Sequence, residues 1–131
     1  MKKKFNSHIV KANSSKLHKQ VFELLRERFP GYTIAQEYPF EVYDENEKKH
    51  VLFFDLMIKE LDIVIECQGR QHFESNNHFH SEEGSLEKAR KNDVLKKKWC
   101  EMNDFTMVEI RYNDKISIEL IEQRIQEKMG A

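Results

Sequence analysis

Two short apolar segments, each carrying one acidic residue, constrain the fold of this chain more than any other feature. They run from His50 to Ile58 and from Leu61 to Gln68, and only Lys59-Glu60 separates them. Their β-branched and aromatic residues favour strands, and so short a link favours an antiparallel hairpin. With Lys59-Glu60 as the turn, Asp55 and Glu66 become diagonal neighbours on one face, roughly 7–8 Å apart at the backbone.

The opposite face of this hairpin is apolar. Side chains alternate between the two faces of a strand, so the residues flanking the acids point the other way. We expect six of them to form core: Leu52, Phe54, Leu56, Ile63, Ile65 and Cys67. Gln68, two residues after Glu66, shares the face of the acids.

The rest of the chain supplies three helices and two further strands. A first helix begins at Ser14 or Ser15 as N-cap and ends at Pro30-Gly31. Pro39 predicts that the strand at 32–43 is an edge strand or bends. The other predicted elements are a helix at 86–103, a strand at 105–112 and a helix at 116–129. The order α-β-β-β-α-β-α predicts an α/β (α+β) domain, a mixed central sheet flanked by helices.

Length and composition bound the organisation of the chain. With 131 residues, of which 39% are hydrophobic, it fits one domain with a real core. We expect residues 1–13 to form a basic arm and residues 14–131 a single domain. The two cysteines give neither a disulfide framework nor a zinc-ligand set, which favours a reducing, intracellular setting. We expect no secretory signal, and the longest apolar run, Val51 to Phe54, is far too short to cross a membrane.

Charge is unevenly distributed along the chain, although the formal net charge is only −1. Residues 1–29 hold eight basic and two acidic residues, an excess of 8 − 2 = +6, and residues 88–98 hold six basic residues and one acid. Such segments can form a phosphate-binding stripe around an acidic centre. Solvated helix faces explain the same charges equally well.

The two acids of the hairpin suggest a metal site. Two carboxylates among apolar neighbours are costly, because burial disfavours each charge and the charges repel. A hard cation removes both costs, and Mg²⁺ commonly takes one or two carboxylates together with water and substrate phosphate. The alternative is that Asp55 and Glu66 lie at a solvated sheet edge, paired with lysines.

The same residues resemble a known family. Asp55, followed by Glu66-Cys67-Gln68, resembles the Asp…(Asp/Glu)-X-Lys signature of the PD-(D/E)XK nuclease superfamily, with Gln68 in the usual lysine position. The run from Glu66 to Phe73 is similar to the very-short-patch-repair-like branch, which includes phage-encoded and homing endonucleases with an E-D-x-H-D constellation. The resemblance extends from about Ser15 to Tyr112 and implies a restriction-endonuclease-like fold.

Within this branch, the resemblance matches the histidine to His72 and the last aspartate to Asp93. The first acid usually lies in the N-terminal helix, where this chain has His18; Glu37 is the other candidate for that role. The repair enzymes' zinc-binding cysteines are absent. That departure favours a smaller phage or mobile-element type over a mismatch-repair enzyme.

The resemblance implies hydrolysis of phosphodiester bonds. Asp55 and Glu66, with the backbone carbonyl of Cys67, would hold Mg²⁺, for which Mn²⁺ can substitute. His72 would act as general acid or base, Asp93 would fix its tautomer, and Gln68 would orient a water. The secondary candidates are Glu37, His80 and, for a phosphate contact, Lys96. Packing remains the alternative role for His18, and a surface salt bridge with Lys97 the alternative for Asp93.

DNA is the partner that the resemblance implies. With no recognisable helix-turn-helix or zinc finger, specificity would come from loops, the basic arm, a homodimer or a partner protein. A different class of function also stays open, a catalytically inactive nucleic-acid-binding or accessory module on the same fold. It is suggested by Gln68 and His18, which depart from the fullest pattern. A structural protein with a fortuitous acidic hairpin is the third reading.

Overall fold

The computed structural model describes residues 16–68 and 82–130, except for the side chains of residues 82–86. The basic arm predicted at 1–13, His72 and His80 lie outside these ranges. The described elements are α2 (Lys16–Arg28), β1 (Ile34–Tyr43), β2 (Lys49–Ile58), the 3-10 helix η1 (Lys59–Leu61), β3 (Ile63–Gln68), α3 (Glu82–Asn103), β4 (Thr106–Arg111) and α4 (Ile118–Gly130). Their order confirms the predicted α-β-β-β-α-β-α arrangement in a single α/β domain.

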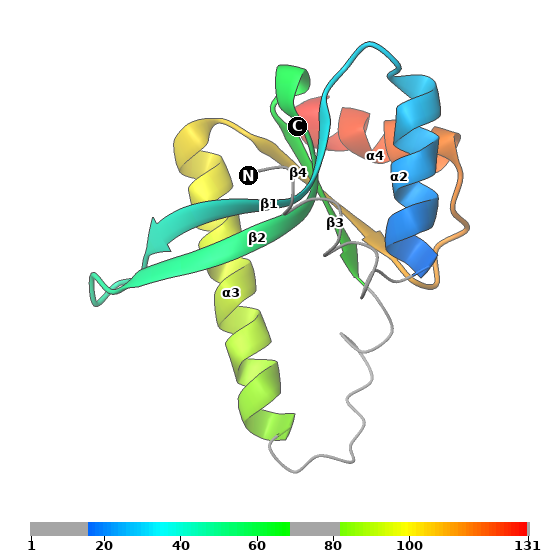
Figure 1. Cartoon of the computed structure of the whole chain (residues 1–131). Coiled ribbons are helices and arrows are strands. Elements are labelled where there is room, and N and C mark those ends of the chain that lie inside the picture. Colours follow the sequence, from blue (N-terminus) through cyan, green and yellow to red (C-terminus); the bar gives the residue numbers. More distant parts are fainter. Residues whose placement is uncertain (1–15, 69–81, 131) are drawn as a thin grey trace.

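The four strands form one mixed sheet in the order β1-β2-β3-β4 (Figure 1). β1 pairs with β2 and β2 with β3 in antiparallel fashion, whereas β3 and β4 are parallel. A parallel pair needs a long crossover, and α3 provides it. Pro39, which cannot donate a backbone hydrogen bond, lies in the edge strand β1 as predicted.

Helices cover both faces of the sheet (Figure 1). α2 and α4 pack on one face, where Val21, Leu25, Ile121 and Ile125 meet apolar side chains of β2, β3 and β4. On the other face, residues of α3 pack against β1 and β2 in a second cluster. This second cluster includes Phe40 stacked on Phe54 with ring centroids 4.2 Å apart, and Trp99 next to both.

Local signals explain where the helices begin and end. The helical stripe of Leu17, Val21 and Leu25 is buried, and the chain turns at Pro30-Gly31 directly after α2. Ser117 is placed as the N-cap of α4, since its hydroxyl accepts the N–H of Leu120 at 3.1 Å.

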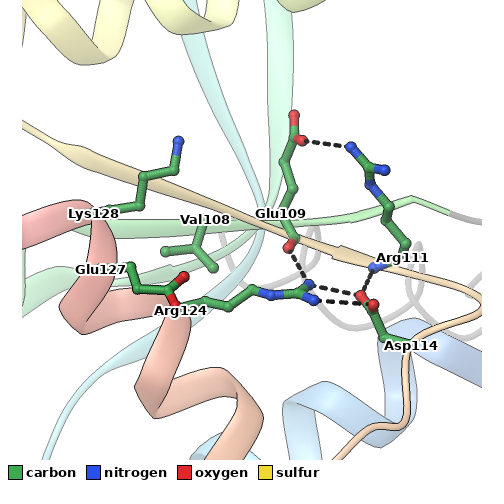
Figure 2. A pocket seen from close by; sticks show the side chains of 7 residues that line it. All are labelled: Val108, Glu109, Arg111, Asp114, Arg124, Glu127 and Lys128. Carbon is green, nitrogen blue, oxygen red and sulfur yellow. Dashed lines mark hydrogen bonds and ion pairs between the residues drawn. The ribbon is translucent and has the colours of Figure 1, made fainter.

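A planar charge pair fixes α4 to the end of β4 (Figure 2). Arg124 donates to both carboxylate oxygens of Asp114, at 2.6 and 3.0 Å, and also to the backbone carbonyl of Glu109 at 3.1 Å. Asp114 in turn accepts the backbone N–H of Arg111 at 2.7 Å. This two-pronged geometry is the strong form of an arginine–carboxylate pair, and it joins helix, loop and strand.

The connection between β2 and β3 differs from the predicted two-residue turn. η1 and Asp62 form it, with Asp62 in the left-handed conformation at φ 56°, which aspartate tolerates better than most residues. Ile58 therefore pairs with Ile63 rather than with Leu61, and the register is shifted by two residues. Asp55 and Glu66 follow directly after the ladder pair of Leu56 with Ile65, so they are close neighbours across the two strands rather than a diagonal pair.

The predicted core face was wrong for Leu52 and Phe54. Leu56 packs with Ile65 in the α2/α4 cluster, but Phe54 is buried in the α3 cluster and Leu52 packs against it. The alternation changes phase between Phe54 and Leu56. At that level of the neighbouring strand, Glu37 has a positive φ of 53°, which bends β1. The sequence contains no glycine there to signal the bend.

Candidate metal centre

Asp55 and Glu66 hold each other's strands at the point where regular pairing between β2 and β3 ends. The last pair of the ladder is Leu56 with Ile65. One residue further, the backbone N–H of Asp55 donates to Glu66 Oε2 at 3.1 Å, and the N–H of Cys67 donates to Asp55 Oδ2 at 2.7 Å. The two carboxylates thus replace backbone carbonyls as acceptors, which keeps both of them beside each other at the sheet.

Lys96 reaches Glu66 from α3. Its Nζ lies 2.7 Å from Glu66 Oε1, and both side chains are largely removed from solvent, with 16% of the lysine and 7% of the glutamate side chain exposed. The same ammonium lies 5.9 Å from the centroid of the Phe54 ring. The sequence predicted a phosphate contact for Lys96; the structure places it as the direct charge partner of Glu66.

Burial dominates the protonation of Glu66. Desolvation and, next, the negative charge of Asp55 raise the pKa of Glu66 to about 8, while Lys96 acts in the opposite direction. A carboxyl group with a pKa in this range titrates near neutrality. In functional sites such shifts accompany clustered like charges, although structural ion-pair networks produce them too.

A second acid and a histidine complete the cluster on the other side of Asp55. His18 of α2, Glu37 of β1 and Asp55 of β2 each offer one ligand atom, and these atoms lie within 4.8 Å of one another. His18 is 3% exposed, and its Nε2 lies 3.2 Å from Oε1 of Gln36. The two candidates for the first acid, His18 and Glu37, are therefore neighbours that both face Asp55.

Burial and the charges of the cluster change the pKa of Glu37. Its pKa is raised, first by burial and then by the negative charge of Asp55, while His18 and Lys96 lower it. Its left-handed backbone is sparsely populated for a residue other than glycine, asparagine or aspartate, and such strain persists only where the surroundings impose it.

The donor set fits a divalent cation. One imidazole nitrogen and two carboxylates are ligands that divalent metals take in proteins, and a cation among them would relieve the repulsion between Glu37 and Asp55. Glu66 lies next to Asp55, whose backbone N–H it accepts, and Lys96 donates to its other carboxylate oxygen. The cluster therefore combines a potential metal site with an ammonium group beside it.

The remaining predicted residues lie around this centre or outside the described ranges. Gln68 is buried at the end of β3, and its backbone carbonyl accepts the N–H of Tyr112 at 2.9 Å. Cys67 is half-buried, and burial raises the pKa of its thiol, with Asp55 as the next cause. Asp93 is half-buried on α3, three residues before Lys96. Because His72 lies outside the described residues, its predicted relation to Asp93 stays a prediction.

Two features of the site were not found from the sequence. Gln36 lies against the His18 ring, and nothing in its sequence neighbourhood distinguishes it from an ordinary strand residue. The pairing of Lys96 with Glu66 depends on how α3 docks on the sheet, and six basic residues between 88 and 98 give no means of choosing among them.

The pocket in Figure 2 lies away from this cluster and is lined by the Arg124–Asp114 pair and its neighbours. Among the described residues, no helix is long and apolar enough to cross a membrane. Comparisons with models of protein families, with curated proteins and with solved structures found no significant match.

Proposed function

We propose that this protein is a metal-dependent endonuclease that hydrolyses phosphodiester bonds in DNA, built on the PD-(D/E)XK plan and of the phage or mobile-element type. One observation carries the proposal: ligand atoms of His18, Glu37 and Asp55 lie within 4.8 Å of one another, next to the Glu66–Lys96 ion pair. Acids, an imidazole and a buried ammonium at one place on a sheet are the parts that phosphodiester hydrolysis needs.

In this proposal Asp55, Glu37 and His18 hold the metal. Glu66 positions Asp55 by accepting its backbone N–H. The bound ion would polarise the phosphate and lower the pKa of an attacking water. Asp55 is positioned for the task by the N–H of Cys67, which leaves its other carboxylate oxygen available for a ligand. His72 keeps its proposed part as general acid or base, with Asp93 as its orienting partner.

Lys96 supplies the positive charge that the superfamily's usual lysine would provide at the position of Gln68. In the superfamily pattern a lysine stands two residues after the second acid, where this chain has a neutral amide. Lys96 brings an ammonium to Glu66 from α3 instead, at 2.7 Å. An ammonium beside the site can stabilise charge that develops on the phosphate, whereas Gln68 is limited to orienting a water.

DNA fits the charge around the site. α3 presents exposed basic residues on the helix that supplies Lys96, namely Lys88, Arg90, Lys91, Lys97 and Lys98. Basic residues along one helix contact phosphates and contribute affinity without sequence readout. Sequence choice would then depend on other parts of the chain, on a homodimer or on a partner protein.

A binding module without catalytic activity is the second candidate. It is favoured by the pairing of Lys96 with Glu66, because a satisfied ion pair can be purely structural. This candidate predicts DNA binding with no turnover in any divalent metal.

Cleavage assays separate the two candidates. Wild type, Asp55→Asn and the control Asp62→Asn are incubated with supercoiled plasmid and with single-stranded DNA, in EDTA, Mg²⁺ and Mn²⁺. Asp62 is an exposed acid of the same hairpin, in a left-handed conformation that asparagine also adopts readily. We expect metal-dependent cleavage by wild type and Asp62→Asn, and a loss of about 10²-fold or more in Asp55→Asn. DNA binding without cleavage by wild type in every metal would instead establish the inactive module.

A further inference from the structure

The chemistry of the ligand atoms at the cluster goes beyond the generic magnesium site that the sequence suggests. His18 contributes a ring nitrogen, and Glu37 and Asp55 contribute carboxylate oxygens, from three different elements of the fold. A nitrogen ligand discriminates among divalent ions, whereas carboxylates accept nearly all of them. The identity of the first ligand therefore bears on which ion the site prefers.

Mg²⁺ and the first-row transition ions differ in their affinity for imidazole nitrogen. Mg²⁺ is a hard cation that prefers oxygen ligands and keeps several waters. Imidazole suits the transition ions, and carboxylates suit Mn²⁺ as well as Mg²⁺. One imidazole with two carboxylates is thus a set in which Mn²⁺ or a later transition ion can use all three ligands, while Mg²⁺ gains little from the nitrogen.

The fold holds the histidine in place for this role. His18 is buried at 3% exposure, and Gln36 Oε1 lies 3.2 Å from its Nε2. A hydrogen-bond partner on one ring nitrogen orients the ring and fixes which nitrogen carries the proton. A buried, oriented imidazole is a better ligand than a surface histidine, because little side-chain freedom is lost on binding.

The contact of Lys96 with Glu66 also favours metal binding at His18, Glu37 and Asp55 over binding at Glu66. The ammonium of Lys96 donates to Glu66 Oε1 at 2.7 Å, so the acid that the sequence pairs with Asp55 already has a partner on α3. Ligand atoms of Glu37 and Asp55 lie within 4.8 Å of each other, and two carboxylates this close repel each other. The charge that still requires compensation therefore lies between His18, Glu37 and Asp55.

We infer that His18, Glu37 and Asp55 form a site selective for a first-row transition ion of the Mn²⁺ type over Mg²⁺, with His18 as the residue that sets the preference. The inference rests on the proposed metal-dependent function and specifies its cofactor.

Metal binding without DNA tests the inference. Wild type, His18→Glu and the control His50→Gln are titrated with MnCl₂ and with MgCl₂ by calorimetry. His50, a half-buried histidine 2.8 Å from Asp44, lies near the far end of the β1–β2 hairpin and serves as a matched histidine replacement. Wild type and His50→Gln should bind Mn²⁺ at least about tenfold more tightly than Mg²⁺, and His18→Glu should lose most of that ratio because all ligands become oxygens.

A spectroscopic measurement on wild type covers the case in which His18→Glu does not fold. Pulsed electron paramagnetic resonance of the Mn²⁺ complex detects nitrogen in the coordination sphere, and we expect the nitrogen signal of one imidazole. Equal affinity for the two ions, or a Mn²⁺ complex without nitrogen coupling, would overturn the inference while leaving a metal-dependent nuclease intact. If neither ion binds wild type, both the inference and the proposed function fail.

Discussion

Asp55 and Glu66 each accept a backbone N–H from the strand of the other: Glu66 from Asp55 at 3.1 Å, and Asp55 from Cys67 at 2.7 Å. This reciprocal contact lets two carboxylates stand side by side where the β2–β3 ladder opens. Each acid keeps one oxygen outside the contact. The second carboxylate oxygen of Glu66 accepts a hydrogen bond from Lys96 Nζ. Asp55 has His18 and Glu37 as neighbours on its other side.

Replacing Lys96 tests whether its ammonium serves catalysis. We expect Lys96→Met to reduce cleavage by about 10²-fold or more, since a charge next to the reacting phosphate is lost. The control is Lys97→Met, which removes an exposed lysine of the same helix that contributes affinity for DNA; with protein at saturating concentration it should change the cleavage rate less than severalfold. Single-turnover cleavage rates, measured with thermal melting of each variant, provide the comparison. If the folded Lys96→Met variant cleaved as fast as Lys97→Met, the catalytic role of Lys96 would be excluded.

The raised pKa of Glu66 predicts a pH dependence of stability in EDTA. The unfolded chain ionises this group near 4.5, whereas the folded protein keeps its proton up to about 8. The folded state therefore binds more protons between these values, and stability falls as the pH rises through the window, at up to about 1.4 kcal/mol per pH unit.

Glu66→Gln should reduce this slope, because the amide does not titrate, and should leave only the part that the raised pKa of Glu37 contributes. Glu41→Gln, which replaces an exposed acid of β1, should keep the whole slope. Urea unfolding at several pH values between 5 and 8, which lie between the unfolded-state and folded-state pKa of Glu66, measures both slopes. A slope that persists unchanged in Glu66→Gln would refute the assignment of the titration to Glu66.

Consecutive phenylalanines of β2 give a stability test of the α3 face. Phe54 is fully buried against Phe40 and Trp99, whereas Phe53 is 41% exposed on the opposite side. Phe54→Ala should lower the free energy of unfolding by about 3–5 kcal/mol, because it leaves a cavity in the core. Phe53→Ala should cost less than about 1 kcal/mol. Denaturation followed by Trp99 fluorescence measures both, and similar losses would contradict the described packing.

The half-buried pair of Arg124 and Asp114 should contribute more to stability than an exposed ion pair does. Arg124→Met breaks three hydrogen bonds that tie α4 to β4 and its following loop, and we expect a loss of about 1–3 kcal/mol. Arg26→Met, which removes an exposed pair with Glu23 within α2, should stay within about 0.5 kcal/mol.

At acid pH, the free energies of unfolding of wild type and Arg124→Met should become more similar. Arg124 is the main cause that holds the pKa of Asp114 below its ordinary value of 3.8, so the stabilisation is present above that value and is lost as the pH falls through the folded-state pKa. Urea unfolding at pH 7 and in strong acid measures the difference. A gap that stays constant would show that the arginine acts through packing alone.

The sequence was sufficient for the order of elements, because each helix has an apolar stripe and the strands are dense in β-branched and aromatic residues. It was also sufficient to bring Asp55 and Glu66 close together across the hairpin, where the backbone N–H of Asp55 donates to Glu66. The actual register depends on Asp62 adopting a left-handed conformation after a 3-10 turn. No short-range rule selects that conformation over a two-residue turn.

The composition of the cluster was harder to predict than its existence. His18 and Glu37 were alternatives in the sequence because they lie on different elements, and only the packing of α2 on the sheet brings them together. The same holds for Lys96, whose partner is 30 residues away along the chain. Phe54 was placed on the wrong face because the bend at Glu37 has no glycine to announce it.

The position of a bound ion is the most direct test of the proposed metal site at His18, Glu37 and Asp55. Crystals grown with Mn²⁺ would be measured at a wavelength where manganese scatters anomalously, with Asp55→Asn crystals as the comparison. We expect an anomalous peak between His18, Glu37 and Asp55 in the wild type, and a weaker peak or none in Asp55→Asn. Saturating Mn²⁺ with no anomalous density among these three residues, or with density only elsewhere on the molecule, would contradict the proposed site.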